Sequence, residues 1–136
     1  SFFKKYILRV CREARISEFD KHLQIDYLAG MLSDHVDPEK TFGDRGDLVS
    51  VLDTLKAQVE SPGETLSGYR KAADRILFYH SFFPEAFRRR LVSIRFYAEA
   101  AKTFYRVVGN YGISVCGLIS EEYSLWRFVL RTARMR

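Results

Sequence analysis

Six arginines in the C-terminal half of the chain have the residue type and spacing for a binding role. They are Arg88, Arg89, Arg90, Arg127, Arg131 and Arg134. The first three are consecutive, and the last three recur every three or four residues, which places them on one stripe of a helix. Guanidinium groups bind phosphates and carboxylates through paired N–H donors. Both sets are therefore candidates for a basic face that binds an anionic partner.

The same arginines also fit an ordinary solvated surface. Consecutive residues fan around most of a helical turn, so Arg88, Arg89 and Arg90 cannot all face one direction. Cations near the end of a helix are stabilised by the helix dipole without any ligand, which applies to Arg131 and Arg134. The sequence leaves both interpretations open.

Charge is unevenly distributed along the chain. The net charge is +5, but residues 1–69 carry −3 and residues 70–136 carry +8. A basic half favours an acidic partner, and nucleic acid is one such partner. No helix-turn-helix or RNA-binding signature accompanies the charge, so a nucleic-acid-associated protein is the alternative hypothesis and not the first.

Histidines and carboxylates do not form a recognised metal-binding pattern. His22 and Asp26 stand four residues apart and would share a helix face. Residues 34–47 hold further candidates, namely His35, Asp37, Glu39, Asp44 and Asp47. A metal site needs several ligands that converge, and this spacing matches no zinc, EF-hand or di-iron motif. We therefore expect neither a metal nor any other cofactor.

His80 is the residue with the clearest potential for proton transfer. It lies beside a run of aromatic residues, and Glu85 follows five residues later. The two could form a proton-transfer pair, or His80 could be a hydrogen-bonded structural residue. The chain has no Gly-x-Ser-x-Gly elbow, no P-loop and no cysteine in a catalytic context. Enzymatic activity stays uncertain, and these absences argue against it.

The stretch 77–109 organises the elements that must position these side chains. Pro84 lacks an N–H and disfavours helical backbone at Phe83, so one helix should end there. A second helix should begin at Pro84, with Glu85 in its first turn. Phe82, Phe83, Pro84 and Glu85 together form the predicted structural corner.

A long helix is expected after this corner. Ser93 is either its N-cap or a bend, and Gly109 is its expected end. Its apolar positions recur at helical spacing, and they are Tyr97, Ala100 or Ala101, Phe104, Val107 and Val108.

The run from Tyr69 to Tyr105 resembles a family of small uncharacterised bacterial all-helical proteins with a Phe-Phe-Pro-Glu corner. In that family a leucine-rich helix ends in glycine before the corner, and an aromatic pair precedes a small-residue helix that ends near Ala-Tyr. Residues 82–85 match the corner and Phe96-Tyr97 stands for the aromatic pair. Ser81 replaces the glycine, and Phe104-Tyr105 replaces Ala-Tyr. The resemblance implies an α-helical fold and brings no known activity.

Two helices are expected near the N-terminus. Residues 1–15 form an apolar stripe with a basic polar face, which suits either packing on a core or lying on a membrane surface. The next helix should start at a capping box of Ser17 and Asp20 and continue to Val36. Its predicted buried face consists of Phe19, Leu23, Tyr27, Leu28, Met31 and Leu32.

The remaining elements follow from local start and stop signals. Residues 37–47 read as a loop, and a third helix should run from its N-cap Asp47 to Glu60. A capping box at residues 61–64 should open the fourth helix. Residues 110–120 are the least helical segment, and Ser120 should start the last helix. The apolar side of that helix comprises Tyr123, Trp126, Val129, Leu130 and Ala133.

These elements predict an all-α, single-domain globular bundle of about six to seven helices over residues 1–136. A chain of 136 residues with 47% hydrophobic residues can bury a sizeable core. No apolar run reaches the roughly 20 residues of a transmembrane helix. Cys11 and Cys116 form no motif, so we expect two free thiols and not a disulfide. Free thiols in turn favour a cytoplasmic location.

The leading functional hypothesis is a non-enzymatic helical protein-interaction module. It would either self-associate as a homo-oligomer, with a dimer as the commonest form, or bind another protein. The support is the 15% aromatic content, since short aromatic-rich helices can carry more apolar surface than one small bundle hides. The alternative is nucleic-acid binding by the basic C-terminal half.

Removal of divalent metal should leave the protein folded. Because no ligand set converges in the sequence, excess EDTA should not change the Tm measured by circular dichroism. A fall of more than about 4 °C that zinc or calcium reverses would show that a structural metal contributes on the order of 1 kcal/mol or more.

Overall fold

Helices form nearly the whole of the described chain. The computed structural model describes residues 2–36, 46–88 and 93–135. Its helices in order are α1 (Lys4–Glu13), α2 (His22–His35), α3 (Gly46–Glu60), α4 (Leu66–Phe82), the 3-10 helix η1 (Pro84–Phe87), α5 (Ile94–Tyr111), α6 (Ser114–Glu121) and α7 (Tyr123–Arg134). The prediction of an all-α fold with about six to seven helices is confirmed. Across the described residues, every helix is too short or too polar to cross a lipid bilayer.

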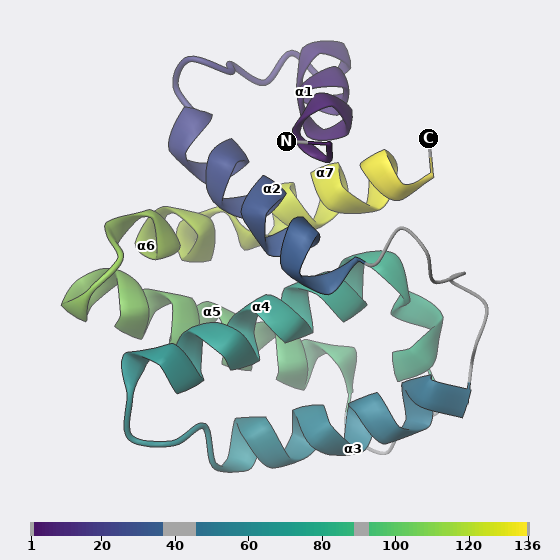
Figure 1. The fold of residues 1–136 in the computed structure, drawn as a ribbon, viewed down its shortest axis with the longest axis vertical. Helices are drawn as coiled ribbons and strands as arrows, with labels where there is room; N and C mark the ends of the chain where they lie inside the picture. Colours follow the sequence, from purple (N-terminus) through teal and green to yellow (C-terminus); the bar gives the residue numbers. More distant parts are fainter. Residues whose placement is uncertain (1, 37–45, 89–92, 136) are drawn as a thin grey trace.

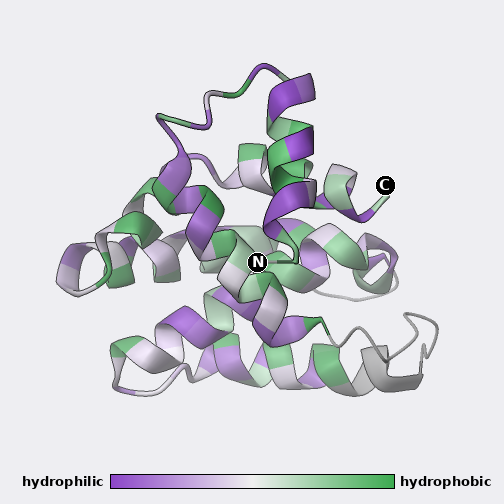
Figure 2. Ribbon diagram, turned by 45° about the horizontal axis from the view of Figure 1, so that its top comes forward, coloured by the Kyte–Doolittle hydropathy of each residue, from purple (hydrophilic) through white to green (hydrophobic). Residues whose placement is uncertain are grey.

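Helices α4 and α5 lie side by side at the centre, and the other helices pack around them (Figure 1). On one side α3 contacts α4 and η1. On the other side lie α1, α2, α6 and α7, with α1 packed against α7 and α2. Hydrophobic and hydrophilic residues alternate along the outer helices (Figure 2), as expected when each helix turns one face to the core.

The core faces of three helices agree with the predicted patterns. All five predicted residues of α7 are buried, namely Tyr123, Trp126, Val129, Leu130 and Ala133. Helix α5 buries Tyr97, Ala101, Phe104 and Val108. Helix α1 buries Ile7, Val10 and Cys11. It therefore packs its apolar stripe on the core, which was one of the two interpretations of this helix. Cys11 and Cys116 are free, as predicted.

The corner after α4 is confirmed, with one refinement. Helix α4 ends at Phe82, Phe83 is its C-cap, and Pro84 opens a 3-10 helix instead of an α-helix. Both phenylalanines are buried, which anchors the corner to the core. Ser93 then caps α5, since its hydroxyl accepts a hydrogen bond from the Phe96 N–H at 3.3 Å. This contact decides between the two interpretations of Ser93.

The start of α2 differs from the prediction. The Ser17 hydroxyl accepts a hydrogen bond from the Asp20 N–H at 3.2 Å, yet the helix begins only at His22. Phe19 and Leu23, which were predicted to be buried, are 86% and 52% exposed. The Ser17 contact closes a turn ahead of the helix, and the chain enters α2 with its first apolar residues on the solvent side.

Two further predicted helix starts are wrong. Residues 61–64 precede α4, and its N-cap is Thr65, whose hydroxyl accepts a hydrogen bond from the Gly68 N–H at 3.3 Å. Ser120 lies inside α6, and its hydroxyl donates to the carbonyl of Lys102 at 2.7 Å. Ser120 therefore ties α6 to α5 and does not cap α7.

The connection between α3 and α4 explains why no helix starts at Ser61. Gly63 has a φ of +92°, a left-handed conformation that interrupts a helical start and that glycine adopts without strain. Helix α3 itself begins at Gly46, one residue before the predicted cap Asp47. The predicted loop residues 37–45 lie outside the described part of the chain.

The segment after Gly109 is helical, contrary to the prediction. Helix α5 continues through Gly109 to Tyr111, and α6 occupies most of the segment that was expected to be least helical. The two helices approach closely where Gly109 faces Gly117. A Cβ atom on Gly109 would lie only 2.4 Å from the Gly117 nitrogen. Glycine is needed here for close helix packing, and the same residue type also serves as a helix stop.

Substitutions at two helical glycines should have opposite effects. Gly109→Ala should destabilise the protein by about 1–3 kcal/mol, because the added methyl group would overlap the backbone of α6. Gly30→Ala should stabilise it by about 0.5–1 kcal/mol, because a methyl group there meets no atom within 4 Å. Urea unfolding monitored by circular dichroism measures both, and equal effects would contradict the close approach of α5 and α6.

Candidate functional site

The predicted stripe of arginines lies on α7, next to the end of α4. Arg127, Arg131 and Arg134 come from successive turns of α7, and α7 packs against α4 (Figure 1). We call these three residues the arginine stripe. The guanidinium of Arg134 lies over the ring of Phe83, 5.3 Å from its centroid. The stripe therefore borders the corner that ends α4.

The other predicted arginines are not placed as a set. Arg88 follows η1 and is exposed. Arg89 and Arg90 lie outside the described residues. Of the six predicted arginines, the structure therefore places three together, and these form the arginine stripe.

Acidic side chains do not neutralise the arginine stripe in the part of the chain that the structure describes. Four other cations do have acidic partners, in the pairs Lys4–Asp26 at 2.7 Å, Arg12–Glu18 at 2.8 Å, Lys21–Glu122 at 2.7 Å and Lys102–Glu99 at 3.1 Å. The three arginines fall within about 60° of the helix circumference at 3.6 residues per turn. Like charges at this spacing repel one another, so the stripe is a local excess of positive charge.

His80 lies between the end of α4 and the arginine stripe. Its side chain is buried, and its Nδ1 lies 3.2 Å from the hydroxyl of Tyr123 on α7. Burial, together with the nearby positive charges of Arg127 and Arg131, lowers its pKa to about 3. His80 is therefore neutral near pH 7, and its ring is close to both arginines.

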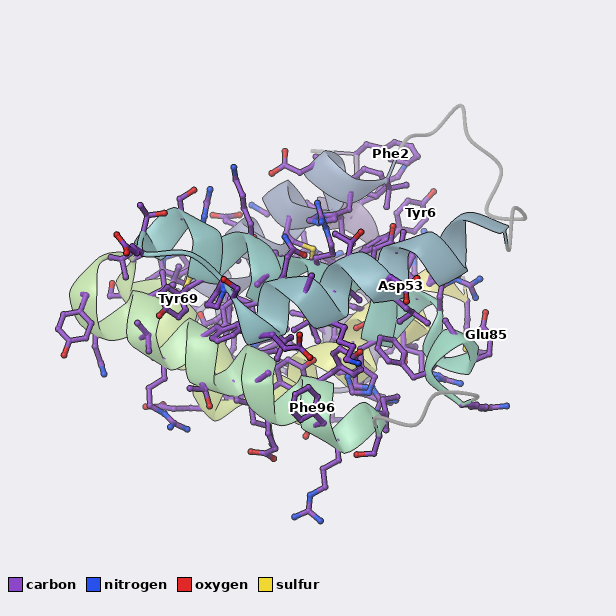
Figure 3. The ribbon with its side chains drawn as sticks, turned by 90° about the horizontal axis from the view of Figure 1, so that it is seen from below. Phe2, Tyr6, Asp53, Tyr69, Glu85 and Phe96 are labelled. Carbon is purple, nitrogen blue, oxygen red and sulfur yellow. The ribbon has the colours of Figure 1, made fainter. Side chains whose placement is uncertain are left out.

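The alternative of a proton-transfer pair between His80 and Glu85 does not fit this geometry. Glu85 is exposed, and Figure 3 shows it at the outer edge of the molecule. The hydrogen-bonding partner of His80 is Tyr123 on another helix. The structure thus favours the interpretation of His80 as a hydrogen-bonded residue near the bend.

Among the described residues, four buried polar atoms on α4 and α7 have no protein hydrogen-bond partner. They are His80 Nε2, Ser81 Oγ, Trp126 Nε1 and Arg127 Nε. Unsatisfied buried polar groups are rare in proteins because each one costs the free energy of its lost hydration. Because these atoms belong to two helices that pack together, the contact between α4 and α7 is a candidate position for a bound group. The sequence contains no signal for this feature, since it depends on which atoms remain unpaired.

A second cluster of buried polar groups joins α2, α4 and α5, and the carboxyl group at its centre accepts two hydrogen bonds. The hydroxyl of Tyr27 on α2 and that of Tyr105 on α5 both donate to Oδ1 of Asp74 on α4, at 2.8 Å and 2.7 Å. Burial raises the pKa of the Asp74 carboxyl, while the hydrogen bonds from the two tyrosines lower it in part. Sequence analysis did not single out Asp74, although an acid among the buried residues of α4 was a detectable signal.

The cysteine nearest this cluster is a poor nucleophile. Cys116 on α6 is buried and interacts with Tyr27. Burial raises the pKa of its thiol to about 11. The thiolate, which is the reactive form, is therefore scarce near neutral pH.

Three of the residues considered as metal ligands, His22, Asp26 and His35, have partners elsewhere, whereas Asp37, Glu39, Asp44 and the side chain of Asp47 lie outside the described part of the chain. His22 Nδ1 lies 2.9 Å from the Phe19 carbonyl, and Asp26 pairs with Lys4. His35 Nδ1 lies 2.9 Å from the Met31 carbonyl. Within the described residues, no group of three or more His, Cys, Asp or Glu side chains could hold a metal ion.

An open groove between α3 and α5 is the other surface feature of note. It has a volume of about 510 Å³, and its lining residues are Val59, Ser93, Arg95, Phe96, Glu99, Ala100, Thr103 and Phe104. Phe96 is 44% exposed and lies at the surface near the start of α5 (Figure 3). The groove is shallow and mostly apolar, and the charged groups on its lining have opposite signs, so it lacks the uncompensated charge of the arginine stripe.

Comparisons of the chain with protein-family models, with curated proteins and with solved structures find no match. The resemblance to bacterial proteins with a Phe-Phe-Pro-Glu corner therefore stays a prediction.

The Asp74 cluster should contribute strongly to stability. Asp74→Ala removes the shared acceptor of two tyrosine hydroxyls, and Tyr105 is fully buried, so the loss should be about 2–4 kcal/mol. Asp26→Ala is the matched control, because it breaks a largely exposed ion pair and should cost less than about 1 kcal/mol. Urea unfolding at pH 7 compares the two.

The same variant tests the raised pKa of Asp74. The folded protein holds the Asp74 proton more tightly than the unfolded chain, whose carboxyl has an ordinary pKa of 3.8. The stability that Asp74 provides relative to Asp74→Ala is therefore greatest below pH 3.8, and it decreases as the pH rises through the folded pKa. A difference that increases with pH over this interval would show that the hydrogen bonds outweigh burial.

Proposed function

We propose that the protein is a non-enzymatic interaction module that binds an acidic segment of another protein along α7. The observation that carries the proposal is the arginine stripe, whose three charges have no acidic partner among the described residues. Arg131 and Arg134 are exposed and Arg127 is partly exposed. The same segment carries two exposed apolar side chains, Phe128 and Met135, which are 53% and 74% exposed.

The composition of this face supports a protein partner. Arginine, methionine and aromatic residues are enriched in protein interfaces, where an apolar centre is combined with polar contacts. Arg127 and Arg134 stand seven residues apart, which spans about 10 Å along the helix axis. Acidic residues seven positions apart on a partner helix, which is about two turns, have the same span. An amphipathic acidic helix is therefore complementary to the stripe in charge and length.

The chemistry of the buried groups supports a binding role over catalysis. His80 is neutral near pH 7 and its Nδ1 is engaged by Tyr123. Burial raises the pKa values of both cysteines, Cys11 and Cys116. A general base needs a pKa near the working pH, and a cysteine nucleophile needs a lowered one.

Nucleic-acid binding is the second candidate, because an unpaired row of arginines also suits a row of phosphates. If Arg88, Arg89 and Arg90 join the arginine stripe, about four to six phosphate contacts would give a logarithmic salt slope of roughly −3 to −5 on duplex DNA. A protein partner held by the same arginines would be retained after nuclease treatment, whereas nucleic acid would be lost.

Replacing the arginine stripe should abolish partner binding without unfolding the protein. The test compares the native protein with Arg127→Ala/Arg131→Ala/Arg134→Ala as baits in nuclease-treated host extract. Arg95→Ala/Arg106→Ala is the control, because both residues are exposed on α5. A photo-crosslinking amino acid at position 128 then identifies the segment that is bound.

The expected result is a crosslink to an acidic protein segment that the stripe variant loses at least about tenfold and the control retains, as for lost charge-assisted hydrogen bonds. A crosslink to a second copy of this chain would make the module self-associating. Equal retention by all three baits, or recovery of nucleic acid alone before nuclease, would contradict the proposal. Circular dichroism verifies that each variant keeps its helices.

A further inference from the structure

We propose that the contact between α4 and α7 contains a binding site for a phosphate dianion, formed by His80, Arg127 and Arg131. The inference rests on the proposed function and makes it more specific, because it identifies the acidic group of the partner as a phosphorylated side chain.

Two unpaired buried atoms lie on opposite sides of this contact. His80 comes from α4, and its Nδ1 is engaged by the hydroxyl of Tyr123 at 3.2 Å. When that hydroxyl donates to Nδ1, the ring proton is on Nε2, which is then a buried donor without an acceptor. Arg127 comes from α7, one helical turn after Tyr123, and its Nε–H is also a buried donor without an acceptor.

The charges around these donors favour an anion. Arg127 and Arg131 are one turn apart, and both are close enough to His80 to lower its pKa. Two uncharged rings also lie beside the His80 ring, namely Tyr123 from α7 and Phe87 from η1. An anion among these groups would accept the unpaired donors and reduce the repulsion between the two guanidinium groups.

Phosphate fits this site better than carboxylate does. A phosphate monoester carries about −1.5 to −2 charges at pH 7 and presents three acceptor oxygens in a tetrahedral arrangement. Two guanidinium groups and one imidazole N–H supply two positive charges and donors from both helices. A carboxylate has a single charge and two oxygens in one plane, so it would leave positive charge uncompensated.

The site is covered in the absence of a ligand. His80 Nε2 and Arg127 Nε are inaccessible to solvent, whereas the side chain of Arg131 is exposed and that of Arg127 is partly exposed. Rotation of these long side chains, which takes picoseconds to nanoseconds at a surface, would admit the phosphate to the buried donors.

Histidine NMR tests the site directly. The protein has three histidines, so the ring resonances of His80 can be assigned by a single substitution. The probes are inorganic phosphate, N-acetyl-phosphoserine amide and acetate, at pH 7 and constant ionic strength. Both phosphate probes should shift the His80 resonances in a saturable way, and acetate should not. His22, which is exposed at the start of α2, serves as the internal control.

Two variants separate the site from general charge effects. Arg131→Gln should weaken phosphate binding at least about tenfold, as expected for the loss of charge-assisted hydrogen bonds. Arg106→Gln, at an exposed arginine of α5, should leave it unchanged. Because Arg131 is exposed, the first variant should keep the Tm of the native protein, which circular dichroism verifies.

The outcomes distinguish this site from the proposed function. Tighter binding of the phosphoserine probe supports a phosphorylated partner, and equal binding of both probes supports the site with free phosphate as its ligand. No shift of His80, an equal shift of His22, or no effect of Arg131→Gln would overturn the phosphate site. If partner capture still depends on the arginine stripe in that case, the interaction module stands without it. If both tests fail, both proposals are wrong.

Discussion

Most residues of α4 from 72 to 82 are buried against neighbouring helices, so the polar side chains among them need partners inside the protein. Asp74 is the clearest case, since its carboxylate oxygen accepts hydrogen bonds from Tyr27 of α2 and Tyr105 of α5. A buried acceptor that lost these donors would cost several kcal/mol, so the cluster restricts the positions of α2 and α5 around α4. The buried polar groups of α4 therefore limit the ways in which the other helices can pack around it.

The C-terminal end of α4 meets the same requirement incompletely. His80 obtains one hydrogen bond from Tyr123, but its other ring nitrogen and the adjacent Ser81 hydroxyl have none. The break at Phe83 and Pro84 ends the helix at this point and places the Phe83 ring under Arg134. In the middle of α4, Asp74 is hydrogen-bonded to two tyrosines. At the C-terminal end of the helix, polar atoms of His80 and Ser81 without a partner lie near the positive charge of the arginine stripe.

Sequence patterns predicted the fold where a single local cause dominates. The break at Pro84 depends on the covalent structure of proline, and the buried face of α7 depends on helical periodicity, so both were correct. Predictions were wrong where one residue type serves two purposes. Gly109 was taken as a helix stop but allows α5 to approach α6, and Ser120 was taken as a cap but ties those helices together.

The candidate site was predictable only in part for the same reason. The spacing of Arg127, Arg131 and Arg134 placed them on one stripe, and the structure agrees. Their relation to His80 depends on how α4 and α7 pack, which local sequence does not specify. Asp74 could have been recognised as an acid among buried residues, but its two tyrosine donors come from distant helices.

The sequence of α7 also explains why its positive charge is not neutralised within the helix. An acid three or four residues before an arginine would form the usual intrahelical pair. Those positions hold Tyr123 and Ser124 before Arg127, Arg127 and Phe128 before Arg131, and Leu130 and Arg131 before Arg134. The nearest preceding acid, Glu122, is held by Lys21 at 2.7 Å. Among the described residues no acidic side chain pairs with the stripe, and the buried donors beside it are inaccessible to solvent. This combination is the physical reason to assign a ligand to α7 and not to the satisfied cluster around Asp74.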